Sequence, residues 1–160
     1  MITFCLMLFL QEDPLKDGDA VTPVQKWFAE SRVKKDDALR IRDEAAWKEL
    51  WDRHKETKGV KPPAVDFTKH MVVVFPRPMA FGCIPPELVS LDVRETKEAL
   101  RVIAEIRPGR CDNDMHGHPM MMGKAALIVV VPRDKKRVDL VEKPKAGEPK
   151  VVMTLDALKE

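Results

Sequence analysis

Two different hydrophobic spacings follow one another near the middle of the chain, and they predict a helix and then a strand. Trp47, Leu50 and Trp51 fall at i, i+3 and i+4 with mostly charged residues around them, which is the stripe of one amphipathic helix. Asp43 occupies the N-cap position, where its side-chain oxygen can accept a hydrogen bond from a free N–H group of the first turn. After a proline-containing loop, the unbroken apolar run 71–75 predicts a strand that is buried on both faces.

Alternation of apolar and polar residues predicts two β-hairpins in the second half of the chain. Residues 89–93 and 100–106 alternate and are separated by a short polar turn, so we expect them to pair. Residues 127–131 repeat the buried-strand pattern, and residues 138–140 are predicted to return beside them. The charged residues 133–137 would then form the solvent-exposed tip of this second hairpin.

Weaker strand patterns at residues 24–33 and 151–153 complete the predicted fold class, an α+β domain. We expect one main amphipathic helix packed on a mostly antiparallel sheet of about five to seven strands. Residues 1–23 are interpreted as an apolar, signal-like N-terminus with a polar linker, and residues 24–160 as a single α+β domain. Large side chains on the helix and before the central strand are the predicted core anchors: Trp47, Leu50, Trp51 and Phe67.

The apolar start of the chain, MITFCLMLFL, bears on where the protein works. It is too short to span a bilayer, which takes about 20 helical residues. Its length suits the apolar part of a secretory signal, although no basic segment precedes it and no small-residue cleavage site follows. Two interpretations stay open: the tail of an export signal that begins upstream, which makes the protein periplasmic or extracellular, or the first strand of a cytoplasmic protein. A signal or anchor here is the only membrane contact that we expect.

Composition predicts a globular protein and argues against binding to nucleic acid. Hydrophobic residues make up 44% of the chain and charged residues 34%, a balance that supports a folded core. The net charge of +2 arises from 28 basic and 26 acidic residues that are mixed along the sequence, so no basic face is predicted. The chain has no tyrosine, no G-x-S-x-G motif and no glycine-rich phosphate loop, and we therefore do not expect an enzyme.

One polar cluster, CDNDMHGHPMMM at residues 111–122, carries the residue types of a metal site. Cys, His and Met together suit copper(I), and Cys with His also suits zinc. His116 and His118 are two positions apart, so on an extended strand both would project to the same side. The spacing matches no standard zinc motif and needs a further ligand such as His54 or His70, so a surface loop whose methionines reach the core is the alternative. The predicted ligands are Cys111, His116, His118 and Met120.

Cys83 and Cys111 lie in the two irregular segments that flank the first predicted hairpin. In an exported protein we expect them to form a disulfide, which by the loop-closure estimate adds about 3–4 kcal/mol to stability. In a cytoplasmic protein both would stay thiols, and the sulfur of Cys111 would be available to a metal. The predicted disulfide and the predicted metal site therefore compete for one sulfur atom.

The helix pattern D-x-x-x-W-x-x-L-W, the D-F pair that ends the next loop and the following M-V-V-V strand resemble the C-terminal domain of PrcB-like proteins. That family is named for a lipoprotein subunit that associates with a secreted subtilisin-like protease complex and stabilises it. The resemblance covers residues 38–142, and it departs from the family where a Gly-Gly turn often follows the strand, because this chain has FGCIPPE there. The matching residues are Trp47, Leu50, Trp51, Pro63, Val65, Asp66, Phe67, residues 71–74, Pro119 and Val131-Pro132.

The resemblance implies an extracytoplasmic accessory domain that binds another protein and is not an enzyme. In this context Asp66, which precedes an aromatic residue at the entry to a strand, is expected to hydrogen-bond its own turn. We therefore expect a non-catalytic, exported protein-binding domain that associates with a secreted protease or an envelope complex. The first alternative is a periplasmic metal-binding protein that holds copper or zinc in the loop at residues 111–122. A weaker one is a small enzyme with a Cys–His pair.

Overall fold

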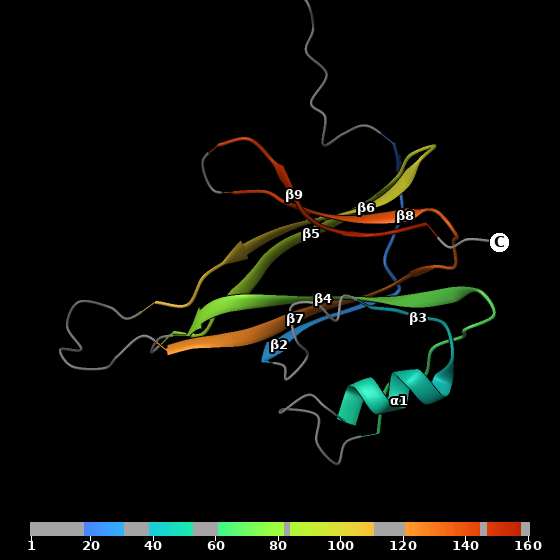
Figure 1. Cartoon of the computed structure of the whole chain (residues 1–160), viewed down its shortest axis with the longest axis horizontal. Coiled ribbons are helices and arrows are strands. Elements are labelled where there is room, and N and C mark those ends of the chain that lie inside the picture. Colours follow the sequence, from blue (N-terminus) through green and yellow to red (C-terminus); the bar gives the residue numbers. More distant parts are fainter. Residues whose placement is uncertain are drawn as a thin grey trace, which may run out of the picture.

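The computed structural model consists mainly of β-strands, arranged in two sheets that lie one over the other (Figure 1). One helix, α1 (Glu44–Asp52), is the only helix within the described residues, and it lies against the outer face of one sheet. The described residues are 18–30, 39–52, 61–81, 84–110, 121–144 and 147–157.

The four-stranded sheet contains the two longest strands, β4 (His70–Phe81) and β7 (Met121–Pro132), which pair antiparallel over their full length. β3 (Leu39–Ile41) pairs with the other edge of β4, and β2 (Gln25–Glu30) pairs with the other edge of β7. The strand order is therefore β2-β7-β4-β3, with every pair antiparallel. The apolar run predicted as a buried strand forms the start of β4, in the interior of this sheet.

The five-stranded sheet is built around the first predicted hairpin, whose strands are β5 (Glu87–Glu95) and β6 (Ala99–Arg107). These two strands pair antiparallel, so the prediction of this hairpin is confirmed. β1 (Asp19–Ala20) adds to the edge of β5, while β8 (Arg137–Glu142) and β9 (Lys150–Leu155) extend the sheet beyond β6. β6 and β8 run parallel, and the other pairs in this sheet are antiparallel.

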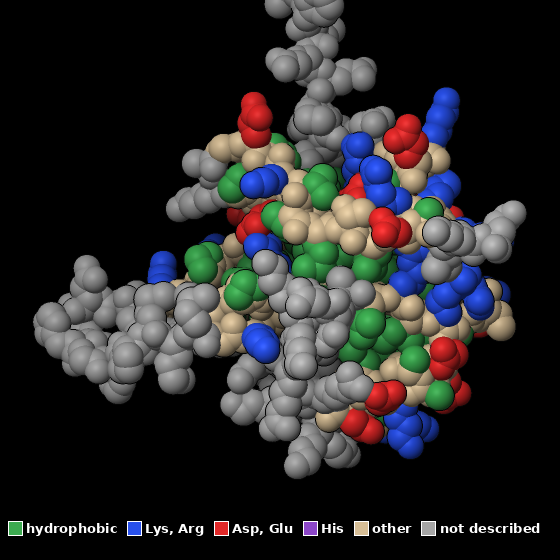
Figure 2. Space-filling view, in the orientation of Figure 1, with side chains coloured by type: hydrophobic (Ala, Val, Ile, Leu, Met, Phe, Trp, Pro, Cys, Tyr) green, Lys and Arg blue, Asp and Glu red, His purple; other side chains and the backbone are tan. Residues whose placement is uncertain are grey.

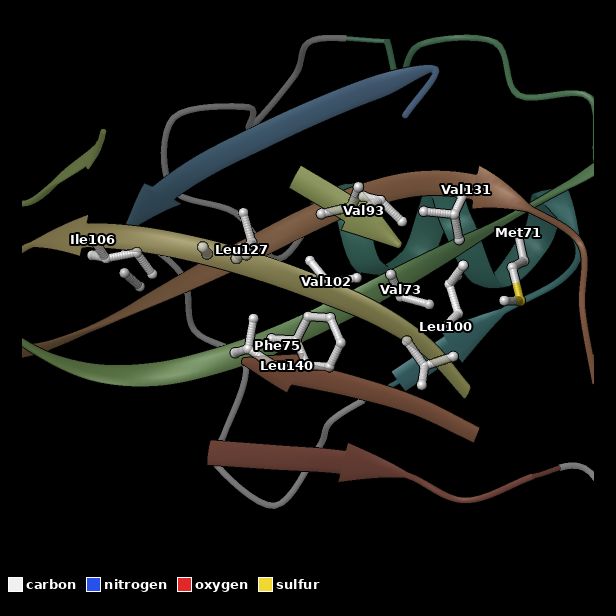
Figure 3. Close-up of a cluster of buried hydrophobic side chains, with 14 of the residues drawn as sticks. Met71, Val73, Phe75, Val93, Leu100, Val102, Ile106, Leu127, Val131 and Leu140 are labelled. Atoms are coloured by element: carbon white, nitrogen blue, oxygen red, sulfur yellow. The ribbon is translucent and has the colours of Figure 1, made fainter. Parts of the chain in front are cut away.

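The main core lies between the two sheets (Figure 3). Along β4 the odd-numbered residues Met71, Val73 and Phe75 face the five-stranded sheet and are 0% exposed. They meet Leu100 of β6 and Leu140 of β8 from the opposite sheet. Because successive side chains of a strand point to opposite faces, this core uses only half of the apolar residues in β4.

The even-numbered residues of β4 face the other way and pack beneath α1. Val72 and Val74 are 0% exposed and belong to a second buried cluster, at whose edge Phe67 is half-buried. At the start of the helix, Ala46 N donates to Asp43 Oδ1 at 2.9 Å, so the predicted N-cap is confirmed. The helix contributes Trp47, Leu50 and Trp51 to this second cluster, and these side chains are 1%, 2% and 5% exposed.

The predicted fold class, an α+β domain with one main amphipathic helix packed on a single sheet, is wrong. The protein is mostly β, with a four-stranded and a five-stranded sheet packed face to face, and α1 is a short accessory of nine residues. The apolar runs indicated strands buried on both faces, but they did not indicate what covers each face. One face of β4 is covered by a second sheet and the other by the helix.

The second predicted hairpin is also wrong, because β7 and β8 belong to different sheets. The charged residues 133–136 form a turn that carries the chain from one sheet to the other, not a hairpin tip. Within this turn, Asp134 Oδ1 accepts from Lys135 N at 2.6 Å and from Lys136 N at 2.9 Å. Beyond the turn, β8 pairs with β6 and β9 and has no pairing with β7.

The apolar segment 1–10 lies outside the described residues. Residues 18–23, which the sequence assigned to the linker, include β1 and its pairing with β5. Gly18, just before β1, has φ +101°, and a Cβ added there would lie 2.5 Å from the carbonyl oxygen of Glu95, so only glycine fits. No helix in the described ranges is both long and apolar enough to cross a membrane.

Candidate binding groove

Most of the residues that the sequence singled out for chemistry lie outside those that the structure describes. The predicted metal ligands Cys111, His116, His118 and Met120 lie outside the described residues, as does Cys83, the other half of the predicted disulfide. Of the two further ligands considered, His54 is also outside them, and His70 is the first residue of β4. Within the described part of the chain, no group of three or more His, Cys, Asp or Glu side chains is placed to hold a metal ion.

A groove of about 880 Å³ lies between α1 and the segment 61–67. Trp47 contributes to its floor and is 1% exposed, so a ligand would touch little more than the edge of this ring. The opposite wall is apolar and half-buried, and it includes Pro62, Val65 and Phe67. The groove therefore offers an apolar surface that is partly open to solvent, which is the anatomy of a binding cleft.

The wall segment is held in place by hydrogen bonds at both ends. The indole Nε1 of Trp47 donates to the carbonyl of Pro63 at 3.0 Å, which ties the segment to the helix. At the other end, Arg133 Nη1 donates to the carbonyl of Phe67 at 2.5 Å, from just beyond the end of β7. The two consecutive prolines, Pro62 and Pro63, also prevent this stretch from continuing as a helix.

Asp66 forms the turn that leads from the groove wall into β4. Its Oδ1 accepts from Thr68 N at 3.0 Å and from Thr68 Oγ1 at 2.5 Å, and its carbonyl accepts from His70 N at 2.9 Å. The hydrogen bonds from Thr68 favour the ionised carboxylate and lower the pKa of Asp66 below its ordinary value. The prediction that this aspartate hydrogen-bonds its own turn is confirmed.

Beneath the groove, three tryptophans form one aromatic cluster. The ring centroids of Trp47 and Trp51 are 5.1 Å apart, and Trp27 of β2 lies 5.7 Å from the first and 5.4 Å from the second. These separations are those of tilted and edge-to-face aromatic pairs, which stabilise a core beyond simple area burial. The helix is thus anchored to the edge strand β2 through Trp27. The weak alternation of apolar residues in β2 did not predict this contact.

Charged side chains form the rim of the groove, and sequence reasoning missed them as functional candidates. Glu44, Lys48 and Asp52 line it from the helix, and Lys61 lines it from the other side. The three helical residues are spaced i, i+4 and i+8, and this spacing beside the tryptophan stripe is the signal that could have found them. Figure 2 shows acidic and basic side chains interspersed over the part of the surface that carries α1. An apolar centre with a polar rim is characteristic of a protein–protein contact.

Comparison of the chain with family models, with curated proteins and with solved structures finds no match. The resemblance to PrcB-like proteins therefore stays a prediction. The groove between α1 and residues 61–67 is the feature of the described residues that best combines apolar surface, depth and charged groups.

Proposed function

We propose that this protein is a non-catalytic binding domain that holds a segment of a partner protein in the groove between α1 and residues 61–67. The groove itself carries the proposal, because an apolar wall with Val65 and Phe67 lies opposite a charged helical edge. A partner side chain that enters it would cover apolar surface that is now half-exposed.

A protein segment suits this groove better than a small molecule does. Small-molecule sites bury about 70–90% of their ligand, and their lining is predominantly apolar. Here the charged lining residues Glu44, Lys48, Asp52 and Lys61 are all exposed, and only Trp47 is fully buried. Exposed charges around half-buried apolar groups are instead the composition of an interface rim around its centre.

The class of partner follows from the resemblance to PrcB-like proteins and not from the groove. On that basis we propose a secreted protease or an envelope complex as the partner, and an exported location for this protein. The groove adds the surface through which such a partner would be held.

Site-specific photo-cross-linking tests the proposal in the cells that make the protein. A photoreactive residue at Lys48 should give a discrete covalent adduct with another protein, because this side chain lines the groove. The same residue at Lys97, an exposed position in the β5–β6 turn, serves as the control and should give no such adduct.

A second variant distinguishes binding in the groove from nonspecific cross-linking. Val65→Asp places a charge on the apolar wall and should abolish the adduct formed from position 48, while circular dichroism checks that the fold is kept. Equal adducts at the two positions, or an adduct that survives Val65→Asp in a folded protein, would overturn the proposed function.

A further inference from the structure

We infer that the partner segment is an extended strand with basic, apolar, acidic, apolar and basic residues in succession. This inference rests on the proposed function of the groove and specifies the chemistry of what the groove holds. It follows from the signs and spacing of the rim charges and from the apolar wall opposite α1.

The rim charges are free to bind a partner. Glu44, Lys48 and Asp52 are exposed, and none of them makes a hydrogen bond or ion pair within the described residues. Their signs alternate along the helix as negative, positive and negative. A partner with the complementary order, positive, negative and positive, would satisfy all three at once.

The spacing of these charges matches an extended chain. Four residues of an α-helix rise about 6 Å, so Glu44 and Asp52 are separated by about 12 Å along the axis. Two residues of a β-strand advance about 6.6 Å, so every second residue of a partner strand falls opposite successive rim charges. Over the whole site the mismatch is about 1 Å, which long charged side chains can absorb.

The two unlike walls of the groove favour a strand over a helix. A strand points successive side chains to opposite sides, so one short segment can present charged groups to α1 and apolar groups to residues 61–67 at the same time. A helix is also bulkier, with a diameter of about 10 Å against a spacing of about 4.8 Å between neighbouring strands.

The wall opposite the helix indicates which residue type the partner segment has between its charged residues. Alternate side chains of a strand point to opposite sides, so if the charged ones face α1, those between them face residues 61–67. This wall presents Pro62, Val65 and Phe67, which match apolar side chains. The partner segment therefore alternates charged and apolar residues.

Short blocked peptides test this inference with the purified protein. The probe Gly-Lys-Val-Glu-Val-Lys-Gly should bind about tenfold more tightly than its charge-reversed form Gly-Glu-Val-Lys-Val-Glu-Gly, as measured by isothermal titration calorimetry at low salt. The triple variant Glu44→Lys, Lys48→Glu, Asp52→Lys should invert this preference. The pair Lys97→Glu and Glu98→Lys, at exposed positions of the β5–β6 turn, is the matched control and should leave the preference unchanged.

The outcomes separate this inference from the proposed function. Equal binding of the two peptides, no inversion in the triple variant, or tighter binding of a helical peptide with the same charges at i, i+4 and i+8 overturns the inferred partner chemistry. If neither peptide binds while the cross-link from position 48 persists, the inferred chemistry fails and the binding function stands. If that cross-link is absent, the binding function itself fails.

Discussion

The indole of Trp47 donates from Nε1 to the main-chain carbonyl of Pro63 at 3.0 Å. This hydrogen bond joins the floor of the groove to its opposite wall, across 16 positions of sequence. Trp47 is 1% exposed and Pro63 is half-buried, so the bond is partly shielded from water. It therefore couples the stability of the helix to the shape of the groove.

Replacing Trp47 by phenylalanine should reveal the contribution of this bond. Trp47→Phe keeps an aromatic ring but removes the donor and leaves the Pro63 carbonyl without it, at an expected cost of about 1–3 kcal/mol in unfolding free energy. Trp27→Phe is the control, because Trp27 belongs to the same aromatic cluster and its indole makes no hydrogen bond within the described residues. Equal losses in urea denaturation of the two variants would show that the bond adds nothing.

Arg40 on β3 should contribute more to stability than other surface arginines. Its Nη2 donates to the carbonyl of Lys136 at 2.8 Å and to that of Asp156 at 3.1 Å. These bonds connect the edge of the four-stranded sheet to the turn before β8 and to the residue after β9, which are both strands of the five-stranded sheet. Arg40→Lys loses the forked donor geometry and should lower the unfolding free energy by about 1–3 kcal/mol. Arg107→Lys, whose exposed ion pair with Glu87 is of the same length, should cost less than about 1 kcal/mol. The prediction fails if the two variants have the same denaturation midpoint.

Asp66 should make stability depend on pH in the acid range. Its pKa is lowered in the folded protein by hydrogen bonds from Thr68, so its contribution is complete above the unfolded value of 3.8 and is lost as pH falls through the lower folded value. Asp66→Asn should therefore melt below the wild-type protein at pH 7, and the two melting temperatures should converge as pH is lowered below 3.8. A difference that stays constant with pH would contradict this assignment.

The predicted disulfide can be tested by mass spectrometry. Ile84 and Arg110 pair through two main-chain hydrogen bonds of 2.9 and 3.0 Å, and Cys83 and Cys111 are the next residues outward along the chain. The two cysteines themselves lie outside the described residues, so their pairing stays a prediction. The oxidised protein should be lighter by two hydrogens than the reduced one, also in a Cys5→Ser variant. Loss of this difference in Cys5→Ser would assign the bond to another pair.

The predicted metal site calls for a titration under reducing conditions. Copper(I) or zinc should bind with a stoichiometry of one if Cys111, His116, His118 and Met120 act as ligands. The double variant His116→Ala, His118→Ala should then lose the bound ion, whereas His70→Ala would lose it only if that residue supplies a further ligand. Uptake that is unchanged in the double variant would end the metal hypothesis.

Local features of the fold were predictable because their causes lie within a few residues of each other. The spacing of Trp47, Leu50 and Trp51 and the side chain of Asp43 are enough to predict α1 and its cap. Alternation across a short turn is enough to predict the β5–β6 hairpin, and Asp66 precedes the Thr68 that it binds by only two positions. The three charges beside the tryptophan stripe, Glu44, Lys48 and Asp52, were visible too, but only the groove made them candidates for binding.

The amino-acid sequence was enough to predict the long strands and the buried face of the helix, because hydrophobic periodicity reports burial whichever element provides the cover. The short edge strands β1 and β3 carry no such pattern and were not predicted. The division of the strands between two sheets became visible only in the folded structure. A short turn between β7 and β8 suits a hairpin, yet β8 pairs in parallel with β6 in the other sheet. The reason is physical: β4 and β7 are apolar on both faces, and one helix of nine residues covers only the outer face. The inner face requires a second sheet, whose partners are distant in sequence and leave no mark in local spacing.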